Sequence, residues 1–281
     1  MVMSELEELG SENGLAESAE KPLRQRRGVY LLPSFLTVGN LLCGYYAILM
    51  TLKGTVVSFD DAAKAIGLAI VFDMLDGRVA RATHTSSELG KQFDSLADVI
   101  SFGVAPALLA FDWGVRGMLL SSVPLAIVIY RLGWVVAFAY LICCAWRLAR
   151  FNIQGMAPER PRAFVGLPTP AAAGMIAATV HAAQVPIARW WLSLLWIGLV
   201  LLLAVLMAST VRYMAFKEIR WRRRQSSVTF ILIGLLIAAI LMFSQVVLLT
   251  IATLYLLTGI TGRVLRQFRH RPSAPASDAN S

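Results

Sequence analysis

Residues 73–98 read DMLDGRVARATHTSSELGKQFDSLAD, and this stretch decides how the chain folds. It contains four aspartates: Asp73, Asp76, Asp94 and Asp98. The residues on either side, IGLAIVF at 66–72 and VISFGVAPALLAF at 99–111, are almost entirely apolar. A carboxylate near the centre of a transmembrane helix costs about 2.5–3.5 kcal/mol on insertion scales. We therefore expect a chain to keep four of them in such surroundings only for a function.

Helical spacing places the aspartates on the faces of two helices. The first set occupies positions i, i+3, i+4, i+7 and i+8, which share one face: Asp73, Asp76, Gly77, Ala80 and Arg81. The second set occupies i, i+4 and i+8: Gly90, Asp94 and Asp98. Antiparallel helices joined by a loop at 83–88 would bring the two faces together. The spacing therefore predicts one pocket that holds all four carboxylates.

Four carboxylates in one pocket favour bound cations, because they cannot all remain ionised alone. Oxygen ligands suit Mg²⁺ or Mn²⁺ better than zinc, and no histidine or cysteine in the sequence is placed to contribute. Two such ions about 3.5–4 Å apart form the usual clamp for in-line attack at phosphorus. Gly77, Ala80 and Gly90 leave room for a ligand to approach the backbone. Close helix packing is the alternative role of these small residues, but it does not explain the aspartates.

The composition indicates a multi-pass membrane protein. Of the 281 residues, 57% are hydrophobic and 15% are charged, and the mean hydropathy is +0.65. Soluble domains carry about 25% charged residues, so an ordinary cytosolic enzyme, a disulfide-stapled secreted domain and a disordered chain are all excluded. The formal net charge is +9, but the positive residues flank apolar runs. That placement suits anionic lipid headgroups better than nucleic acid, and we expect no nucleic-acid partner.

The chain is predicted to form an all-α, polytopic transmembrane bundle. A disordered acidic tail (1–20) and a basic juxtamembrane segment (21–30) come first, followed by a transmembrane catalytic domain (31–267) and a disordered tail (268–281). Crossing the hydrocarbon takes about 20 apolar residues, and about eight segments fit: 31–52, 61–82, 92–112, 132–151, 165–185, 190–210, 227–243 and 246–265. Residues 113–131 remain ambiguous. The run 118–130 is apolar but short and contains Pro124, so we interpret it as a re-entrant or interfacial piece.

The distribution of basic residues predicts the sidedness of this bundle. Positive residues are enriched in cytoplasmic loops. With both termini and the aspartates on the cytoplasmic side, all but five of the 26 lysines and arginines lie on that side; the five are Lys53, Lys64, Arg116, Arg131 and Arg189. A further crossing at 118–130 would scatter the positive residues over both sides. We therefore expect eight spans in a cell membrane, with the active site and both termini facing the cytoplasm.

The aspartate stretch resembles the signature of the CDP-alcohol phosphotransferases. Every fixed position of D-x2-D-G-x2-A-R-x8-G-x3-D-x3-D is present between Asp73 and Asp98. Three flanking segments are similar to the branch of this family that uses CDP-diacylglycerol and serine: LPSFLTVGNLLCG at 32–44, RLARFN at 147–152 and FVGLPTPAAA at 164–173. The resemblance implies the fold of that family and covers about half of the chain.

The resemblance also implies a reaction and a division of roles. The phosphatidyl group of CDP-diacylglycerol would pass to the hydroxyl of L-serine by direct displacement, releasing CMP. Two divalent cations, Mg²⁺ or Mn²⁺, would be held by Asp73, Asp76, Asp94 and Asp98, and Asp98 would also act as the general base. The nucleotide would be bound by Asp73, Asp76, Gly77, Ala80, Arg81, Gly90 and by Asn40, a polar residue alone in an apolar span. The family further implies a homodimer in membrane lipid.

Two arginines are candidates for binding the carboxylate of serine. Arg147 and Arg150 lie at i and i+3 near the end of a span, on the same side as the aspartates, although anchoring at the cytoplasmic surface would also explain them. Ser95 and Ser101 are interpreted as helix-packing hydroxyls, and His181 as a packed polar residue.

Two other functions remain open at this point. One is a sister enzyme of the same family that uses glycerol 3-phosphate or an inositol (phosphate) acceptor. The other is a cation-coupled membrane transporter, which would explain the carboxylates but not the spacing of Gly77, Ala80 and Gly90 relative to them.

Overall fold

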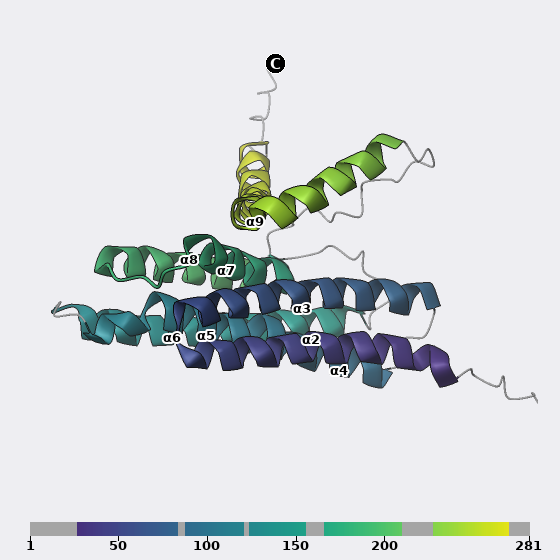
Figure 1. Ribbon diagram of the computed structural model, residues 1–281, viewed down its shortest axis with the longest axis horizontal. Helices are drawn as coiled ribbons and strands as arrows, with labels where there is room; N and C mark the ends of the chain where they lie inside the picture. The colour runs from purple at the N-terminus through teal and green to yellow at the C-terminus, as the bar shows by residue number, and fades with distance from the viewer. Residues whose placement is uncertain (1–26, 84–87, 121–123, 156–165, 210–226, 270–281) are drawn as a thin grey trace, which may run out of the picture.

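The computed structural model describes residues 27–83, 88–120, 124–155, 166–209 and 227–269. Within these ranges the chain is helical and contains no strand, which confirms the all-α prediction (Figure 1). The predicted tail at 1–20, most of the basic segment 21–30 and all but the first two residues of the predicted tail 268–281 lie outside the described residues; residues 268 and 269 belong to the last helix.

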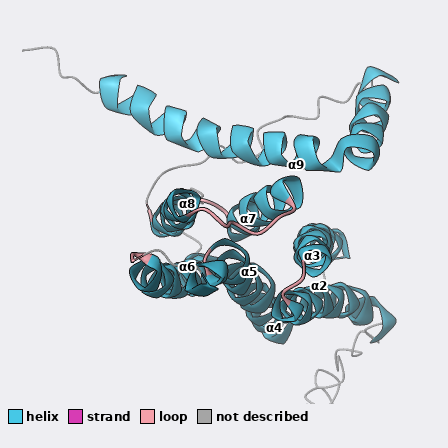
Figure 2. Cartoon of the chain, turned by 60° about the vertical axis from the view of Figure 1, so that its left-hand side comes forward, coloured by secondary structure: helices cyan, strands magenta, loops and turns pink. Residues whose placement is uncertain are grey.

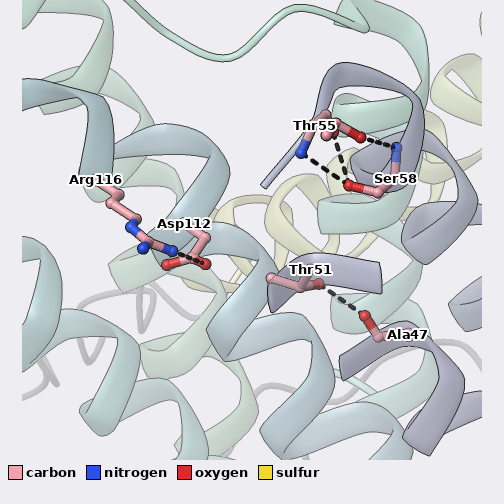
Figure 3. A network of polar contacts seen from close by, with 6 residues as sticks. All are labelled: Ala47, Thr51, Thr55, Ser58, Asp112 and Arg116. Atoms are coloured by element: carbon pink, nitrogen blue, oxygen red, sulfur yellow. Dashed lines mark hydrogen bonds and ion pairs between the residues drawn. The ribbon is translucent and has the colours of Figure 1, made fainter. Parts of the chain in front are cut away.

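The first two helices form a tight hairpin. Helix α2 (Arg27–Lys53) packs along α3 (Val56–Thr83), and Gly54, with φ +69°, makes the turn between them. Thr55 and Ser58 cap the start of α3 reciprocally: the Ser58 amide donates to Thr55 Oγ1 at 3.1 Å, and the Thr55 amide donates to Ser58 Oγ at 2.9 Å (Figure 3). This capping box satisfies amides that the first turn of a helix leaves unpaired.

The third helical rod changes type along its length. Helix α4 (Glu88–Asp98) continues into the π-helical turn η1 (Val99–Val104) and then into α5 (Ala105–Gly114). A 3-10 turn, η2 (Arg116–Leu120), follows, and the ion pair between Arg116 Nη1 and Asp112 Oδ2 at 3.0 Å ties it to α5 (Figure 3).

The stretch interpreted as a re-entrant piece at 118–130 is not a separate element. Met118 is buried within η2, and helix α6 (Ala126–Gly155) already begins at Ala126. The predicted span 132–151 is therefore too short at its start. Pro124 lies just before the start of α6, a position where proline is tolerated. The apolar residues from Ala126 onward extend the long helix.

Two further helices cover the bundle. Helix α7 (Thr169–Ala183) packs on α3, and α8 (Trp190–Ala208) packs on α6. The segment that enters α7 is fastened to the end of α8, because the Leu167 amide donates to the Leu206 carbonyl at 3.0 Å. At 15 residues, α7 is shorter than the predicted span 165–185 and is only roughly 22 Å long at 1.5 Å per residue.

The last helix lies outside this arrangement. Helix α9 (Ser227–Arg269) bends at Phe243, whose backbone is not helical, and packs against α7 (Figure 2). The two predicted spans 227–243 and 246–265 thus correspond to the two arms of one kinked helix. The bend falls at the last residue of the first predicted span.

A chain of polar side chains centred on the buried His181 fastens α9 to the bundle next to its bend. His181 of α7 bonds through Nδ1 to a carboxylate oxygen of Asp60 on α3, and its Nε2 lies 2.8 Å from Ser244 Oγ. Asp60 also pairs with Lys64 at 2.7 Å. His181 is therefore a packed polar residue that joins three helices, as interpreted from the sequence.

The described helices include four that are long and apolar enough to cross a membrane: Phe35–Lys53, Glu88–Leu119, Ala126–Ile153 and Trp190–Ala208. The count of eight spans stays a prediction. An outward stripe on α6 is apolar and exposed, as lipid contact requires, and follows i, i+4, i+8 and i+12: Trp134, Phe138, Ile142 and Trp146. The opposite face of α6 enters the core, where Tyr140 is completely buried.

Candidate active site

Three of the four aspartates meet in space. One carboxylate oxygen from each of Asp73, Asp94 and Asp98 lies within 4.8 Å of the other two. Asp73 comes from α3, the other two from α4, and Asp98 is buried. Helical spacing alone predicted this meeting of two faces. The capped turn between α2 and α3 lies far from these carboxylates, because the interval from Ser58 to Asp73 corresponds to roughly 22 Å of helix.

Asp76, the fourth aspartate, is arranged differently. It is buried on α3, and its carboxylate accepts a hydrogen bond from the hydroxyl of Thr37 on α2. It remains close enough to Asp94 and Asp98 for its charge to act on both. The structure therefore groups three carboxylates and holds the fourth beside them through α2.

Asn40 lies against the carboxylate predicted to act as the base. Its side chain is completely buried, and Nδ2 donates to Asp98 Oδ1 at 3.0 Å. The amide oxygen Oδ1 is buried and has no hydrogen-bond partner among the described residues. A buried amide oxygen without a partner is costly, so this atom is available to a donor from a bound ligand.

The small residues of the motif stand next to the aspartates along the same helices. Gly77 and Ala80 follow Asp76 on α3, and Gly90 precedes Asp94 by one turn of α4; all three are partly buried. Arg81 belongs to α3, but its side chain lies outside the described residues.

The carboxylate group has the chemistry of a divalent-cation site. All the convergent atoms are carboxylate oxygens, the ligands preferred by hard cations such as Mg²⁺ and Mn²⁺. Asp94 Oδ1 is buried without a hydrogen-bond partner among the described residues. An unpaired buried carboxylate oxygen beside two further carboxylates is strongly unfavourable unless positive charge compensates it. The residues present therefore fit a bound cation.

The two candidate arginines differ in their surroundings. Arg147 is half-buried, and its Nη1 donates to Thr169 Oγ1 of α7 at 3.3 Å. Its Nε is buried and without a partner among the described residues, and its charge lies within range of Asp98. Arg150 is partly exposed and has no ion pair with another described residue. The structure thus brings Arg147, but not Arg150, toward the aspartates.

Several polar residues at the site were missed from the sequence. Thr37 and Thr169 are the partners of Asp76 and Arg147, and Asn152 donates through Nδ2 to Ser95 Oγ at 2.9 Å. Thr37 precedes Asn40 by three positions and shares its helix face, so a search for polar residues at helical spacing around Asn40 could have found it. Thr169 carries no such local signal.

Comparisons with known proteins agree with this geometry. The family model described as CDP-alcohol phosphatidyltransferase matches residues 30–202, which contain every motif discussed above.

Curated relatives extend the similarity over most of the chain. A protein of Helicobacter pylori strain 26695 is 33% identical over 238 residues, covering 83% of this chain and 90% of the relative. A Bacillus subtilis protein is 33% identical over 187 residues, covering 66% and 92%, and a Mycobacterium leprae protein is 37% identical over 180 residues, covering 60% and 54%. All three are named CDP-diacylglycerol–serine O-phosphatidyltransferase. The chain belongs to the CDP-alcohol phosphatidyltransferase family.

Proposed function

We propose that this membrane protein is a phosphatidylserine synthase, which transfers the phosphatidyl group of CDP-diacylglycerol to the hydroxyl of L-serine and releases CMP. The observation that carries the proposal is the meeting of Asp73, Asp94 and Asp98 beside the buried Asn40. The names of the relatives support serine as the acceptor.

The aspartates would hold two divalent cations, Mg²⁺ or Mn²⁺. Asp73, Asp94 and Asp98 offer convergent oxygens, and Asp76 stands next to them, oriented by Thr37. When bound, the cations neutralise charge that develops on the phosphoryl oxygens and on the leaving CMP. The protein's own contribution is a frame of packed helices that fixes where the diphosphate lies.

Asp98 would accept the proton of the serine hydroxyl. Asn40 donates to Oδ1 of this carboxylate, which fixes its plane and leaves Oδ2 to receive the proton. An alcohol is a weak nucleophile, and a carboxylate placed beside it removes the proton as the bond to phosphorus forms. Attack is direct, so the oxygen of serine enters at phosphorus as the oxygen of CMP leaves.

The nucleotide would lie along the small residues of the motif. Gly77, Ala80 and Gly90 present little side-chain bulk beside the carboxylates, so cytidine and ribose can approach the helix backbones. Arg81 would meet the diphosphate, and the free Oδ1 of Asn40 would accept a hydrogen bond from the ligand.

Arg147 would bind the carboxylate of serine. A buried guanidinium with an unpaired Nε has unused donors, and a carboxylate satisfies them in pairs. Its charge lies within range of Asp98, so one acceptor would reach both with its carboxylate and its hydroxyl. Arg150, the other candidate from the sequence, suits the cytoplasmic surface better because it has no ion pair with another described residue.

The positive residues support an active site and termini on the cytoplasmic side of the cell membrane. We also propose that the enzyme is a homodimer, as its family resemblance implies.

The direct test is CMP release by the purified protein. It is incubated with CDP-diacylglycerol, Mg²⁺ or Mn²⁺, and separately with serine, glycerol 3-phosphate, inositol phosphate or inositol. Of the four acceptors, we expect only serine to support CMP release. Release only with a phosphorylated acceptor would instead identify a sister enzyme. The Asp73→Asn variant should be inactive, whereas Asp61→Asn, on the same helix but outside the carboxylate group, should retain activity.

A further inference from the structure

The helix that carries Asp94 and Asp98 changes its geometry directly after Asp98. In the π turn Val99–Val104, the amide of Ala105 donates to the carbonyl of Ile100, five positions earlier. A π turn contains one residue more than an α turn and is frequent at functional sites. One residue corresponds to about 100° of rotation around the helix axis. The extra residue of the π turn therefore rotates the side chains of α5 relative to the carboxylates of α4.

Helix α2 contacts the π turn at backbone level. Ser101 Oγ donates to the carbonyl of Asn40 at 3.0 Å, and both residues are completely buried. One turn along α2, a Cβ on Gly44 would collide with the backbone and hydroxyl of Ser101. The residue whose carbonyl Ser101 binds is also the residue whose side chain holds Asp98. Asn40 therefore links the π turn to the carboxylate.

Helix α6 contacts the π turn from the other side. Tyr140, which is completely buried, donates through its hydroxyl to the carbonyl of Phe102 at 3.1 Å. A Cβ on the next residue, Gly103, would lie only 3.0 Å from Leu141 Cδ1. A buried phenol that donates to a carbonyl inside an irregular turn stabilises that turn in one conformation.

We propose that Ser101 and Tyr140 are positioning residues, which clamp the π turn between α2 and α6 and so hold Asp98 in register with Asp73 and Asp94. Neither hydroxyl touches the carboxylates. Ser101 acts through Asn40, and Tyr140 acts through the backbone of the turn. This inference rests on the proposed function, since it assigns these hydroxyls a part in that reaction.

A purely structural role for the two hydroxyls makes a different prediction. A hydroxyl that only joins helices contributes to stability wherever it lies in the bundle. Ser193 provides the comparison: it is completely buried, and its Oγ donates to the carbonyl of Gly114 at 2.8 Å, at the other end of the α4–α5 rod. Ser101→Ala and Ser193→Ala thus remove the same kind of hydrogen bond. The first lies next to the carboxylates, and the second lies far from them.

The first experiment compares these two variants in purified full-length protein. We expect Ser101→Ala to lower kcat for serine-dependent CMP release by about ten-fold or more, because small displacements of reacting groups are costly. The KM for serine should stay within about two-fold. In the metal-free protein, Mn²⁺ affinity measured by electron paramagnetic resonance should fall several-fold. Ser193→Ala should leave kcat and Mn²⁺ affinity unchanged, while it lowers Tm at least as much as Ser101→Ala does.

The second experiment tests the contact from α6. Tyr140→Phe removes only the hydroxyl, and Tyr130→Phe on the same helix is the matched control. We expect Tyr140→Phe alone to lower kcat and Mn²⁺ affinity. Unchanged kcat and Mn²⁺ affinity in both Ser101→Ala and Tyr140→Phe would overturn the inference, as would losses that the control variants share. A wild-type protein without serine-dependent CMP release would instead overturn the proposed function, and the Mn²⁺ measurement would still test the clamp.

Discussion

The hydroxyl of Thr37 on α2 donates a hydrogen bond to the carboxylate of Asp76 on α3, although 39 positions separate the two residues in the chain. One turn further along α2, Asn40 donates to Asp98 on α4. Helix α2 carries no acidic residue itself, yet it holds an aspartate from each of the other two helices. The first helix therefore sets the spacing of the acidic group.

This role of α2 predicts a loss of activity in Thr37→Val, which keeps the shape of the side chain but removes the hydroxyl. Asp76 would lose the donor that orients it, and we expect kcat/KM for CDP-diacylglycerol to fall by about ten-fold, the effect of roughly 1.4 kcal/mol. Thr51→Val is the matched control, because the Thr51 hydroxyl donates within α2 to the carbonyl of Ala47 at 2.8 Å. Equal losses in both variants would contradict the role of Thr37.

The role of Asp98 as general base predicts that Asp98→Asn lowers kcat by about 10²–10⁴-fold. The amide cannot accept the proton of serine, but it fills the same space beside Asn40. Binding of CDP-diacylglycerol, measured by equilibrium titration with Mg²⁺ present, should be largely retained. Substantial turnover in this variant would show that another group removes the proton.

Removal of divalent cations should abolish CMP release, and Mg²⁺ or Mn²⁺ should restore it. The cation should also stabilise the fold, because it binds the native arrangement of Asp73, Asp94 and Asp98 and relieves their mutual repulsion. At 100 times its Kd, a ligand of the native state adds about 2.7 kcal/mol. Thermal unfolding with and without Mn²⁺ measures this effect. The Asp94→Asn variant should lose most of the rise in Tm that Mn²⁺ causes. An unchanged rise in Tm would place the cation elsewhere.

Arg147 is predicted to select the acceptor. In Arg147→Gln, the charge-assisted hydrogen bonds to serine are lost, which corresponds to about 1.5–3 kcal/mol and a rise in the KM for serine of roughly ten- to a hundred-fold. The KM for CDP-diacylglycerol should hardly change. Arg150→Gln is the control. Ethanolamine, which lacks the carboxylate, should not be affected by Arg147→Gln; an equal loss with both acceptors would argue against carboxylate binding.

The hydrogen-bonded chain of Asp60, His181 and Ser244 predicts a stability effect without a catalytic one. Ser244→Ala removes one hydrogen bond between α7 and α9, and buried hydrogen bonds between membrane helices contribute about 0.6 kcal/mol on average and up to about 1.7 kcal/mol. We expect a lower Tm with unchanged CMP release. In Thr250→Ala, the lost hydroxyl donates within α9 to Val246, so a smaller change in Tm is expected there.

The sequence pattern predicted the position of the site more accurately than it predicted where the helices begin and end. The spacing of Asp73, Asp94 and Asp98 is a local property of two helices, and it is sufficient to bring the three carboxylates together. Hydropathy, in contrast, does not show where Pro124 lets a helix begin, so 118–130 was misinterpreted. The resemblance to a known family supplied the chemistry that periodicity alone left open, and the family model matches residues 30–202.

Contacts between distant segments could not be predicted from the sequence. Thr169 became visible as the partner of Arg147 only because α6 and α7 lie together, and the same holds for Tyr140 and the π turn. A π turn has no composition of its own, since it differs from an α turn by one residue of register. These tertiary contacts are the part of the site that sequence patterns omit.

The residue that precedes Leu167 has a consequence for acceptor choice. Gly166 adopts φ +92°, and a Cβ at this position would lie 2.6 Å from the carbonyl of Met207. The backbone here passes directly over the end of α8 and, three residues later, delivers Thr169 to Arg147. A residue without a side chain thus sets the place of Thr169, the partner of the arginine proposed to bind serine, and the proposed acceptor pocket rests on the end of α8.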